Sequence, residues 1–349
     1  MLKPRAAVFL VFILPLALTL QGCAVKRWLF GPSKPPSASL NREPGSFPTG
    51  SSVTSDGLAG AISGLSDGKG DTAVNPQYVT EADLLKVVTE LQRLSGKDTY
   101  RFPIPKDVTG ANVYKATLIR LQDYEAKHPG AYPELLAFTR GRAYEELREY
   151  GKAIEQYQVV SQGKNQLKEE AAKAVVVLTR FQEIRQSPLN ATTPVEYIQA
   201  LDNQIAAWQE VQKQQVGTPY EALAREEEER LDRAKVTFLE LNRYSIEDGN
   251  ESVVLAYQQL IGKHKESKNV YRYQIEFADF YCILAQEYVA QNDPQSLRFD
   301  PSTFEDLGRT AMRLYGQVAH EDGVMEKLEA KGKLEALEAY MAKVGRLGR

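Results

Sequence analysis

The sequence is poor in the residues from which most local catalytic and metal-binding motifs are built. It has two cysteines, three histidines and two tryptophans among 349 residues. It contains no HExxH motif, no glycine-rich phosphate loop, no GxSxG elbow and no zinc-type cysteine spacing. These absences exclude the enzyme and cofactor classes that are recognised by such motifs. We therefore expect no cofactor and no catalytic residue of a recognised type.

The chain also lacks an excess of one charge. Lysine and arginine number 43, aspartate and glutamate 46, and the formal net charge is -3. Both signs are interspersed, so no basic patch is available to attract phosphates, and we expect no nucleic-acid partner. The triplet 320–322 (His-Glu-Asp) ends a predicted helix, where three consecutive side chains point in different directions. We predict a surface turn there and no metal site.

The sequence has one long apolar run, and it lies at the N-terminus. Lys3 and Arg5 precede it, and it extends from Ala6 to Leu20. About 15 residues are fewer than the ~20 needed to cross a bilayer. A short positive end followed by an apolar middle is typical of a signal peptide. A transmembrane helix and an ordinary secretory signal are the alternatives.

The run closes with Leu20, Gln21, Gly22 and Cys23, and this sequence resembles the lipobox of bacterial lipoproteins. The resemblance implies that residues 1–22 are a signal peptide and that Cys23 is the lipidated first residue of the mature chain. Acyl chains would then anchor the protein to a membrane. Ala24 stands where such lipoproteins carry an aspartate for inner-membrane retention. The resemblance thus implies the outer membrane, with the protein facing the periplasm.

Residues 23–77 differ in composition from the remainder. About half of residues 31–77 are glycine, proline or serine, and large apolar side chains are sparse. Such a segment cannot bury enough apolar surface to offset the entropy of ordering its backbone. We therefore predict a flexible tether between the lipid and a folded domain.

Residues 78–349 carry apolar side chains at helical spacing, and no strand pattern is evident. Segments 193–196 and 218–221 each place Thr before Pro, with Glu three residues after the Thr, which predicts a capping box at two helix starts. Thr80 and Asp300 are further predicted starts. We count about eleven helices joined by short turns, which favour antiparallel neighbours. The predicted fold class is all-α.

The run from Arg225 to Arg230 contains four consecutive glutamates. Glutamates at 221, 226 and 229 each precede an arginine by four residues, which is the favourable polarity for a pair on one helix face. We interpret this run as a solvated face with ion pairs and not as a ligand site. Cys282 lies in an apolar sequence and is predicted to be a buried small hydrophobic residue.

One segment resembles a tetratricopeptide repeat. Gly141, Tyr144, Ala153 and Tyr157 match its order of small, large, small and aromatic residues. Arg140, Val160 and Asn165 depart from the pattern, and residues 256–264 repeat it more weakly. The resemblance implies antiparallel helical hairpins that are stacked as an α-solenoid, with Gly141 and Ala153 at the close contact between two helices.

Lipidated chains with such repeats are similar to periplasmic scaffold lipoproteins, which suggests an envelope protein that binds other proteins and is not an enzyme. The alternative is a helical enzyme or carbohydrate-binding domain that acts on cell-wall glycan or exported polysaccharide. Two facing carboxylates about 5 to 10 Å apart in a cleft would favour that alternative. The three histidines, His128, His264 and His320, lie in no recognised signature.

Overall fold

The computed structural model describes residues 76–103 and 111–347, which belong to one compact unit, 52–349. Within these residues the chain forms eleven α-helices and one short 3-10 helix, with no strand, so the all-α prediction is confirmed. The elements are α3 (Pro76–Ser95), α4 (Ala111–Lys127), α5 (Pro133–Glu146), α6 (Tyr150–Gln162), α7 (Lys168–Gln186), α8 (Pro194–Gln214), α9 (Pro219–Asn242), η1 (Arg243–Ser245), α10 (Gly249–Lys263), α11 (Val270–Gln291), α12 (Pro301–Ala319) and α13 (Lys327–Leu347). No described helix is both long enough and apolar enough to span a bilayer.

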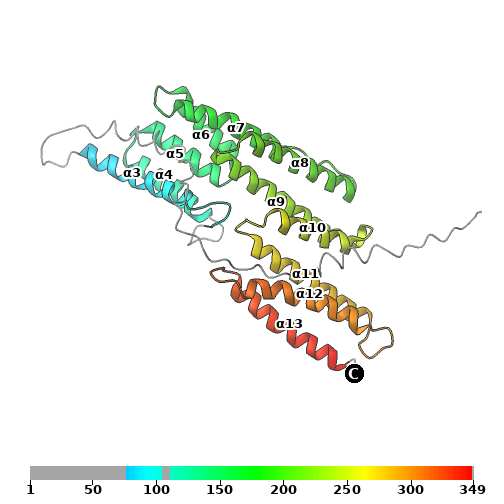
Figure 1. Cartoon of the computed structure of the whole chain (residues 1–349). Coiled ribbons are helices and arrows are strands. Elements are labelled where there is room, and N and C mark those ends of the chain that lie inside the picture. The colour runs from blue at the N-terminus through cyan, green and yellow to red at the C-terminus, as the bar shows by residue number, and fades with distance from the viewer. Residues whose placement is uncertain (1–75, 104–110, 348–349) are drawn as a thin grey trace, which may run out of the picture. The chain divides into compact units, whose positions relative to one another are not determined.

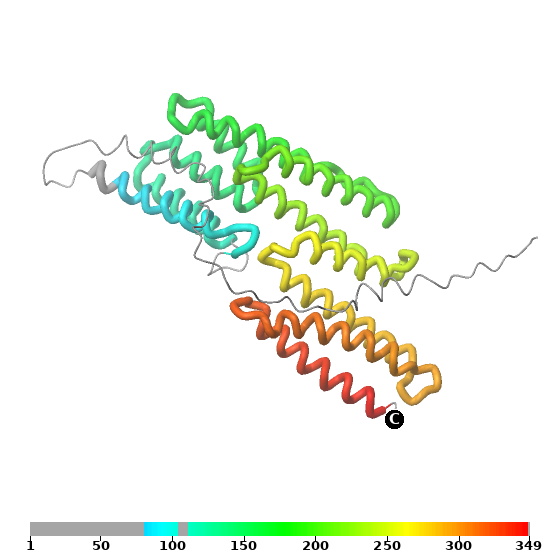
Figure 2. Tube along the Cα trace, viewed as in Figure 1, coloured from blue at the N-terminus to red at the C-terminus, as the bar shows by residue number. Residues whose placement is uncertain are grey.

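Helices that follow one another in the chain pack on one another. The most extensive packing joins α5 to α6, α6 to α7, α8 to α9, α11 to α12 and α12 to α13. The colours of Figures 1 and 2 accordingly pass in order from α3 to α13 through neighbouring helices. Most connections between the helices are short, which favours antiparallel neighbours.

The helix starts show how much of the local structure follows from sequence. At Thr193 the capping box forms, with the Glu196 amide donating to the threonine hydroxyl at 3.2 Å. Asp300 accepts from the amides of Ser302 and Thr303, as a cap should. α3 begins at Pro76 and not at Thr80, since a proline suits the first turn of a helix.

The capping box predicted at Thr218 is wrong. The Thr218 hydroxyl donates backward to the Gln215 carbonyl at 2.8 Å, and it accepts no amide of the helix. Glu221 accepts instead from the amide of Gly217 at 2.7 Å. Gly217 has a φ of 77°, a left-handed turn conformation that glycine adopts without strain. This turn presents the Gly217 amide to Glu221 in place of the Thr218 amide.

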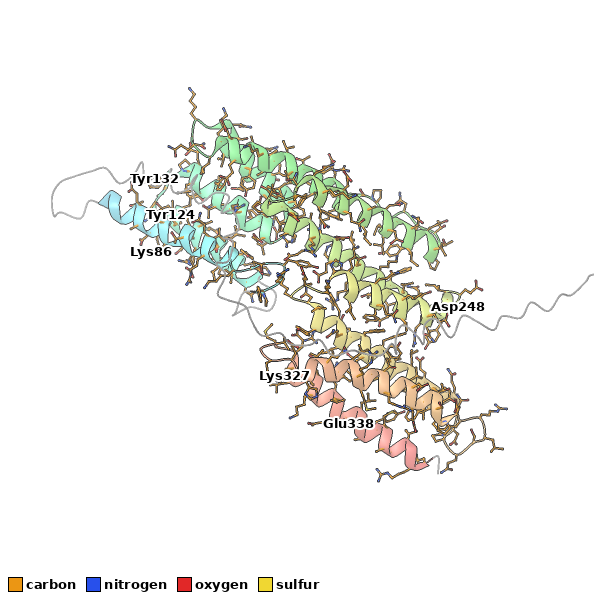
Figure 3. The ribbon with its side chains drawn as sticks, viewed as in Figure 1. Lys86, Tyr124, Tyr132, Asp248, Lys327 and Glu338 are labelled. Atoms are coloured by element: carbon orange, nitrogen blue, oxygen red, sulfur yellow. The ribbon has the colours of Figure 1, made fainter. Side chains whose placement is uncertain are left out.

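Tyrosines attach the first helix to its neighbours. The Tyr124 hydroxyl on α4 donates to the Thr80 carbonyl at 3.1 Å, and the Tyr132 hydroxyl, from the residue before α5, donates to the Glu81 carboxylate. Figure 3 labels both tyrosines near α3. These bonds fix α3 against the α4–α5 pair.

The buried apolar side chains form two main clusters. The first is built by α3 to α8 and the N-terminal half of α9, up to Leu231. The second begins at Val236 of α9 and extends to α13. Within the first cluster, the Phe181 ring stands edge-on to Tyr150 and to Trp208, with centroids 5.4 and 4.9 Å apart. Because α9 contributes to both clusters, its sequence links the two halves of the unit.

Candidate functional site

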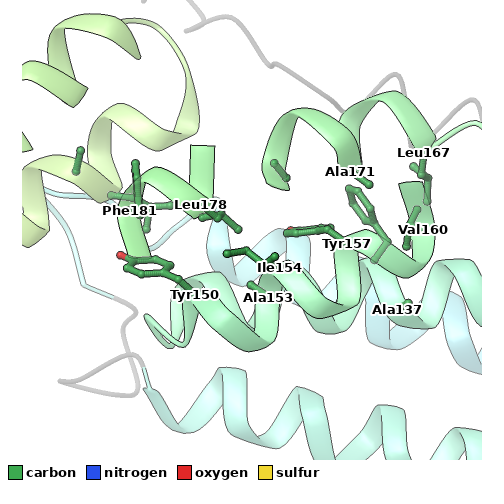
Figure 4. Close-up of a cluster of buried hydrophobic side chains, with 14 of the residues drawn as sticks. Ala137, Tyr150, Ala153, Ile154, Tyr157, Val160, Leu167, Ala171, Leu178 and Phe181 are labelled. Atoms are coloured by element: carbon green, nitrogen blue, oxygen red, sulfur yellow. The ribbon is translucent and has the colours of Figure 1, made fainter. Parts of the chain in front are cut away.

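The hairpin of α5 and α6 contains the residues that resemble a tetratricopeptide repeat. A Cβ added at Gly141 would lie 2.7 Å from the Tyr157 ring, so the glycine permits close contact of the two helices. Ala153 and Tyr157 are buried on α6, as Figure 4 shows, and Tyr144 is partly buried against the same cluster. The four residues therefore take part in the packing of α5 and α6.

The acidic run of α9 is not a solvated face. Glu227, Glu228 and Glu229 are buried, with exposed fractions of 1%, 4% and 2%. The interpretation as i,i+4 surface pairs is therefore wrong for the buried acids. Helices from both halves of the unit surround α9, so its glutamates bond to those helices across the interface. We call Glu226 to Glu229, together with Asp232, the acid row.

The first members of the acid row bond toward the first half. Glu227 accepts from the Tyr150 hydroxyl at 2.9 Å and pairs with Arg230 at 2.8 Å. Glu226 pairs with Arg148, which lies in the α5–α6 turn with a φ of 60°. Buried carboxylates cost several kcal/mol unless such partners replace water, so these contacts determine where the α5–α6 turn can lie.

The other members bond in two further directions. Glu228 accepts from Gln209 of α8 at 2.7 Å and pairs with Lys263 of α10. Glu229 accepts from the Tyr273 hydroxyl of α11 at 2.8 Å and from Ser267. Successive glutamates point around α9 at about 100° intervals. The run of four consequently meets α8, α10, α11 and the α5–α6 turn at one level of the helix.

At the end of the acid row, Asp232, His264 and Tyr100 are joined in series by hydrogen bonds, which we call the relay. His264 is 1% exposed, and its Nε2 lies 2.8 Å from the Asp232 carboxylate. Its Nδ1 lies 2.7 Å from the Tyr100 hydroxyl, which comes from the loop after α3. The two ring nitrogens therefore bridge the Asp232 carboxylate and the Tyr100 hydroxyl.

The pKa shifts of Asp232 and Tyr100 favour the protonation states that keep these hydrogen bonds. Burial opposes ionisation of Asp232, yet hydrogen bonds from His264 and Lys263 outweigh it, and the pKa of Asp232 lies below its ordinary value. Burial, reinforced by the charge of Glu229, raises the pKa of Tyr100. The tyrosine thus keeps its proton and the aspartate its charge. This arrangement stabilises hydrogen bonds and gives no activated nucleophile.

A small pocket lies between α3, α5 and α7. Its volume is about 40 Å³, whereas ligand sites of small molecules typically measure ~300 to 1,000 Å³. Its walls are formed by Val88, Leu91, Gln92, Ser95, Phe138, Thr139, Arg142, Glu146 and Glu170. Burial raises the pKa of Glu146 to about 7, against the lowering effect of Arg148 and Arg142. A pocket of this volume can hold a water molecule but is too small for a sugar ring.

The remaining predicted residues lie apart from the acid row. The Cys282 sulfur is half-buried, 3.6 Å from the Tyr315 hydroxyl, and burial raises the pKa of its thiol. His128 packs beside Tyr124, and His320 is exposed at the end of α12. Leu20, Gln21, Gly22 and Cys23 lie outside the described residues.

One signal in the sequence could have located the acid row. Leu223, Glu227 and Leu231 follow one another at four-residue intervals, so a glutamate occupies a position of the apolar stripe of α9. Reading that stripe would have indicated that Glu227 is buried. The relay has no comparable signal, because Tyr100 and His264 are separated by 164 residues.

In the described ranges, no cluster of three histidine, cysteine, aspartate or glutamate side chains is arranged to hold a metal ion. Comparison of the chain with protein-family models, with curated proteins and with solved structures gave no match.

Proposed function

We propose that the protein is a membrane-anchored envelope lipoprotein whose helical domain, a TPR-like α-solenoid, binds other proteins as a scaffold or assembly factor. In this proposal lipid on Cys23 holds the chain at the outer membrane, facing the periplasm. Residues 23–77 connect that anchor to the helices. The anchor rests on the residues Leu20 to Cys23 alone.

The observation that carries the proposal is the order of helix packing. Neighbours in sequence are neighbours in space from α3 to α13. This order is typical of repeat arrays, in which each unit buries its apolar face on the next. Such arrays present long surfaces over which a protein partner can make many contacts. The close contact of Gly141 with Tyr157 supports the tetratricopeptide likeness of the α5–α6 hairpin.

The chemistry of the titratable groups supports binding over catalysis. Glu227 to Glu229 and His264 are buried, Glu226 and Asp232 are partly buried, and all of them bond to neighbouring elements. The Cys282 thiol has a raised pKa. A glycan-cleaving site would instead need two carboxylates that face each other across an open cleft. The acids of the acid row serve the packing of α9.

Photo-crosslinking in intact cells tests the proposal. A photoreactive residue is placed singly at exposed apolar positions on separate helices, such as Ile119 of α4, Val176 of α7 and Leu328 of α13. We expect one envelope protein to be captured from a group of neighbouring positions, and not from the others. A chain that gives no protein adduct from any exposed helix position would contradict the scaffold.

An alanine scan separates the scaffold from the enzyme. His128, His264, His320 and Cys282 are replaced singly, and each variant is scored for folding, capture and cellular phenotype. Interface energy is concentrated in a few aromatic and arginine anchors, so capture should survive in every folded variant. Loss of a catalytic group lowers a rate by about 10²-fold or more. A folded variant that keeps its partner but has a null phenotype would favour the glycan-acting enzyme.

A further inference from the structure

Two loops that are far apart in sequence meet beside α9. One is residues 96–103, the described part of the connection between α3 and α4, and the other is residues 264–269, between α10 and α11. We call the pair the clasp. The Lys268 amide donates to the Tyr100 carbonyl at 2.8 Å, and the Tyr100 hydroxyl meets His264 at 2.7 Å. Lys268 also pairs with Asp98 at 2.9 Å.

The clasp is unusual in a fold whose helices otherwise pack mainly on their chain neighbours. Its contacts join residues that are 164 to 170 positions apart. In a linear array of repeats, stability is close to a sum of nearest-neighbour terms. A long-range bond adds a constraint that such an array lacks, because it ties the α3–α4 hairpin to the second half of the unit.

Both loops of the clasp rest on the N-terminal half of α9. The Arg225 guanidinium lies over the Tyr100 ring, 4.4 Å from its centroid. Lys268 reaches Glu226 at 3.1 Å, and Ser267 donates to Glu229. The clasp therefore closes over Arg225 to Glu229 of α9, and it reaches Asp232 through His264.

The loop after α3 is held by few contacts: besides Tyr100, Asp98 pairs with Lys268 and accepts from the Tyr114 hydroxyl of α4 at 3.3 Å. Within residues 96–103, all of which the structure describes, Tyr100 is the one buried side chain, at 6% exposure. Phe102 is 67% exposed, and the Arg101–Glu266 ion pair lies at the surface. Exposed ion pairs contribute little. Segments with few buried contacts open locally at low free-energy cost.

We propose that the clasp is a conformational latch. Tyr100 holds the latch closed through its contacts with His264 and Arg225. When the ring leaves this site, both loops open together. The α3–α4 hairpin is then released from the second half of the unit. A ligand that binds only the open form would shift the population toward it. The latch does not depend on the proposed protein-binding role.

Hydrogen exchange of the full chain tests the latch. In Tyr100→Ala we expect exchange to rise by about tenfold or more in residues 96–103 and in residues 264–269 together, because removal of a buried ring is costly. The Lys268 amide, which donates to the Tyr100 carbonyl, is the most informative probe. Helices α5 and α6 should keep the exchange rates of the wild type.

Phe102→Ala is the matched control, since it removes an exposed ring from the same loop. Tyr100→Phe, which deletes only the hydroxyl that meets His264, keeps the test decisive if the alanine variant loses its helical content. We expect a smaller rise of about 2- to 10-fold from that variant in both loops. Wild-type exchange in residues 264–269 in a folded Tyr100 variant would overturn the latch. An equal rise in Phe102→Ala would also overturn it.

Discussion

At the residue scale, Glu146 makes the stability of the domain depend on pH. Burial raises the pKa of its carboxyl from the ordinary 4.5 to about 7. The folded state therefore binds this proton more tightly than the unfolded chain does. The stability that results is fully present below pH 4.5 and is lost as the pH rises to about 7.

Glu146→Gln, which mimics the protonated carboxyl, should remove this loss. We expect the variant to match the wild type near pH 4.5 and to exceed it by about 1 to 3 kcal/mol at pH 8. Urea unfolding at a series of pH values measures the difference. Glu155→Gln on the exposed face of α6 is the control and should leave the profile unchanged. A constant difference between Glu146→Gln and wild type at every pH would contradict the assignment.

Gly141 tests the close contact of α5 and α6. The added Cβ of Gly141→Ala would lie 2.7 Å from the buried Tyr157 ring, so the ring or the helix has to shift. We expect a loss of about 1 to 3 kcal/mol in the free energy of unfolding. Gly332→Ala is the matched control, because a Cβ on α13 meets nothing within 4 Å. That change should stabilise by about 0.5 to 1 kcal/mol. Stabilisation by both alanines in chemical denaturation would refute the close contact.

At the scale of the element, the two Thr-Pro starts show how far sequence determines a cap. Thr193 and Thr218 occupy the same motif, yet only the first accepts an amide of its own helix. The difference comes from Gly217, whose left-handed turn offers a competing amide to Glu221. A spacing rule describes the helix itself and does not describe the turn that precedes it.

The caps accordingly predict unequal costs for equal substitutions. Thr193→Ala should lower the free energy of unfolding by about 1 kcal/mol, because it leaves a helix amide without its acceptor. Thr218→Ala removes a hydroxyl that caps nothing on α9 and should cost less than half as much. Thermal and urea unfolding of the two variants in parallel measure the comparison. Equal losses would mean that the two threonines act alike in solution.

The acid row shows why a helix surface is hard to assign from one sequence. The spacing of Glu226 to Arg230 and of Glu229 to Arg233 fits surface pairs, but Glu226 pairs across helices with Arg148 and Glu229 bonds to α11. Local spacing states which residues are neighbours on a helix. It does not state that a second and a third helix will cover that face. The run is buried only because other helices pack against α9 in the tertiary structure.

At the scale of the molecule, the helical class and the approximate number of helices followed from periodicity and turn residues, which are local properties. The clasp did not, since it joins residues 164 positions apart through a tyrosine and a histidine with no shared motif. The order of the helices was predictable because short turns leave a helix little choice of neighbour. Long-range contacts depend on how all the helices pack together, and no short segment encodes that.

The whole molecule is also the scale at which the anchor is tested. Cys23→Ser replaces the thiol that would receive the lipid, and serine cannot form the thioether. We expect the variant to leave the membrane fraction, or to remain unprocessed with residues 1–22 attached. Cys282→Ser is the matched control, because that half-buried cysteine lies on α11 and should leave both fractionation and mature mass as in the wild type. Fractionation and intact-mass measurement are made on both variants. A Cys23→Ser protein that stays with membranes at the wild-type mature mass would show that the chain is held there by something other than lipid on this residue.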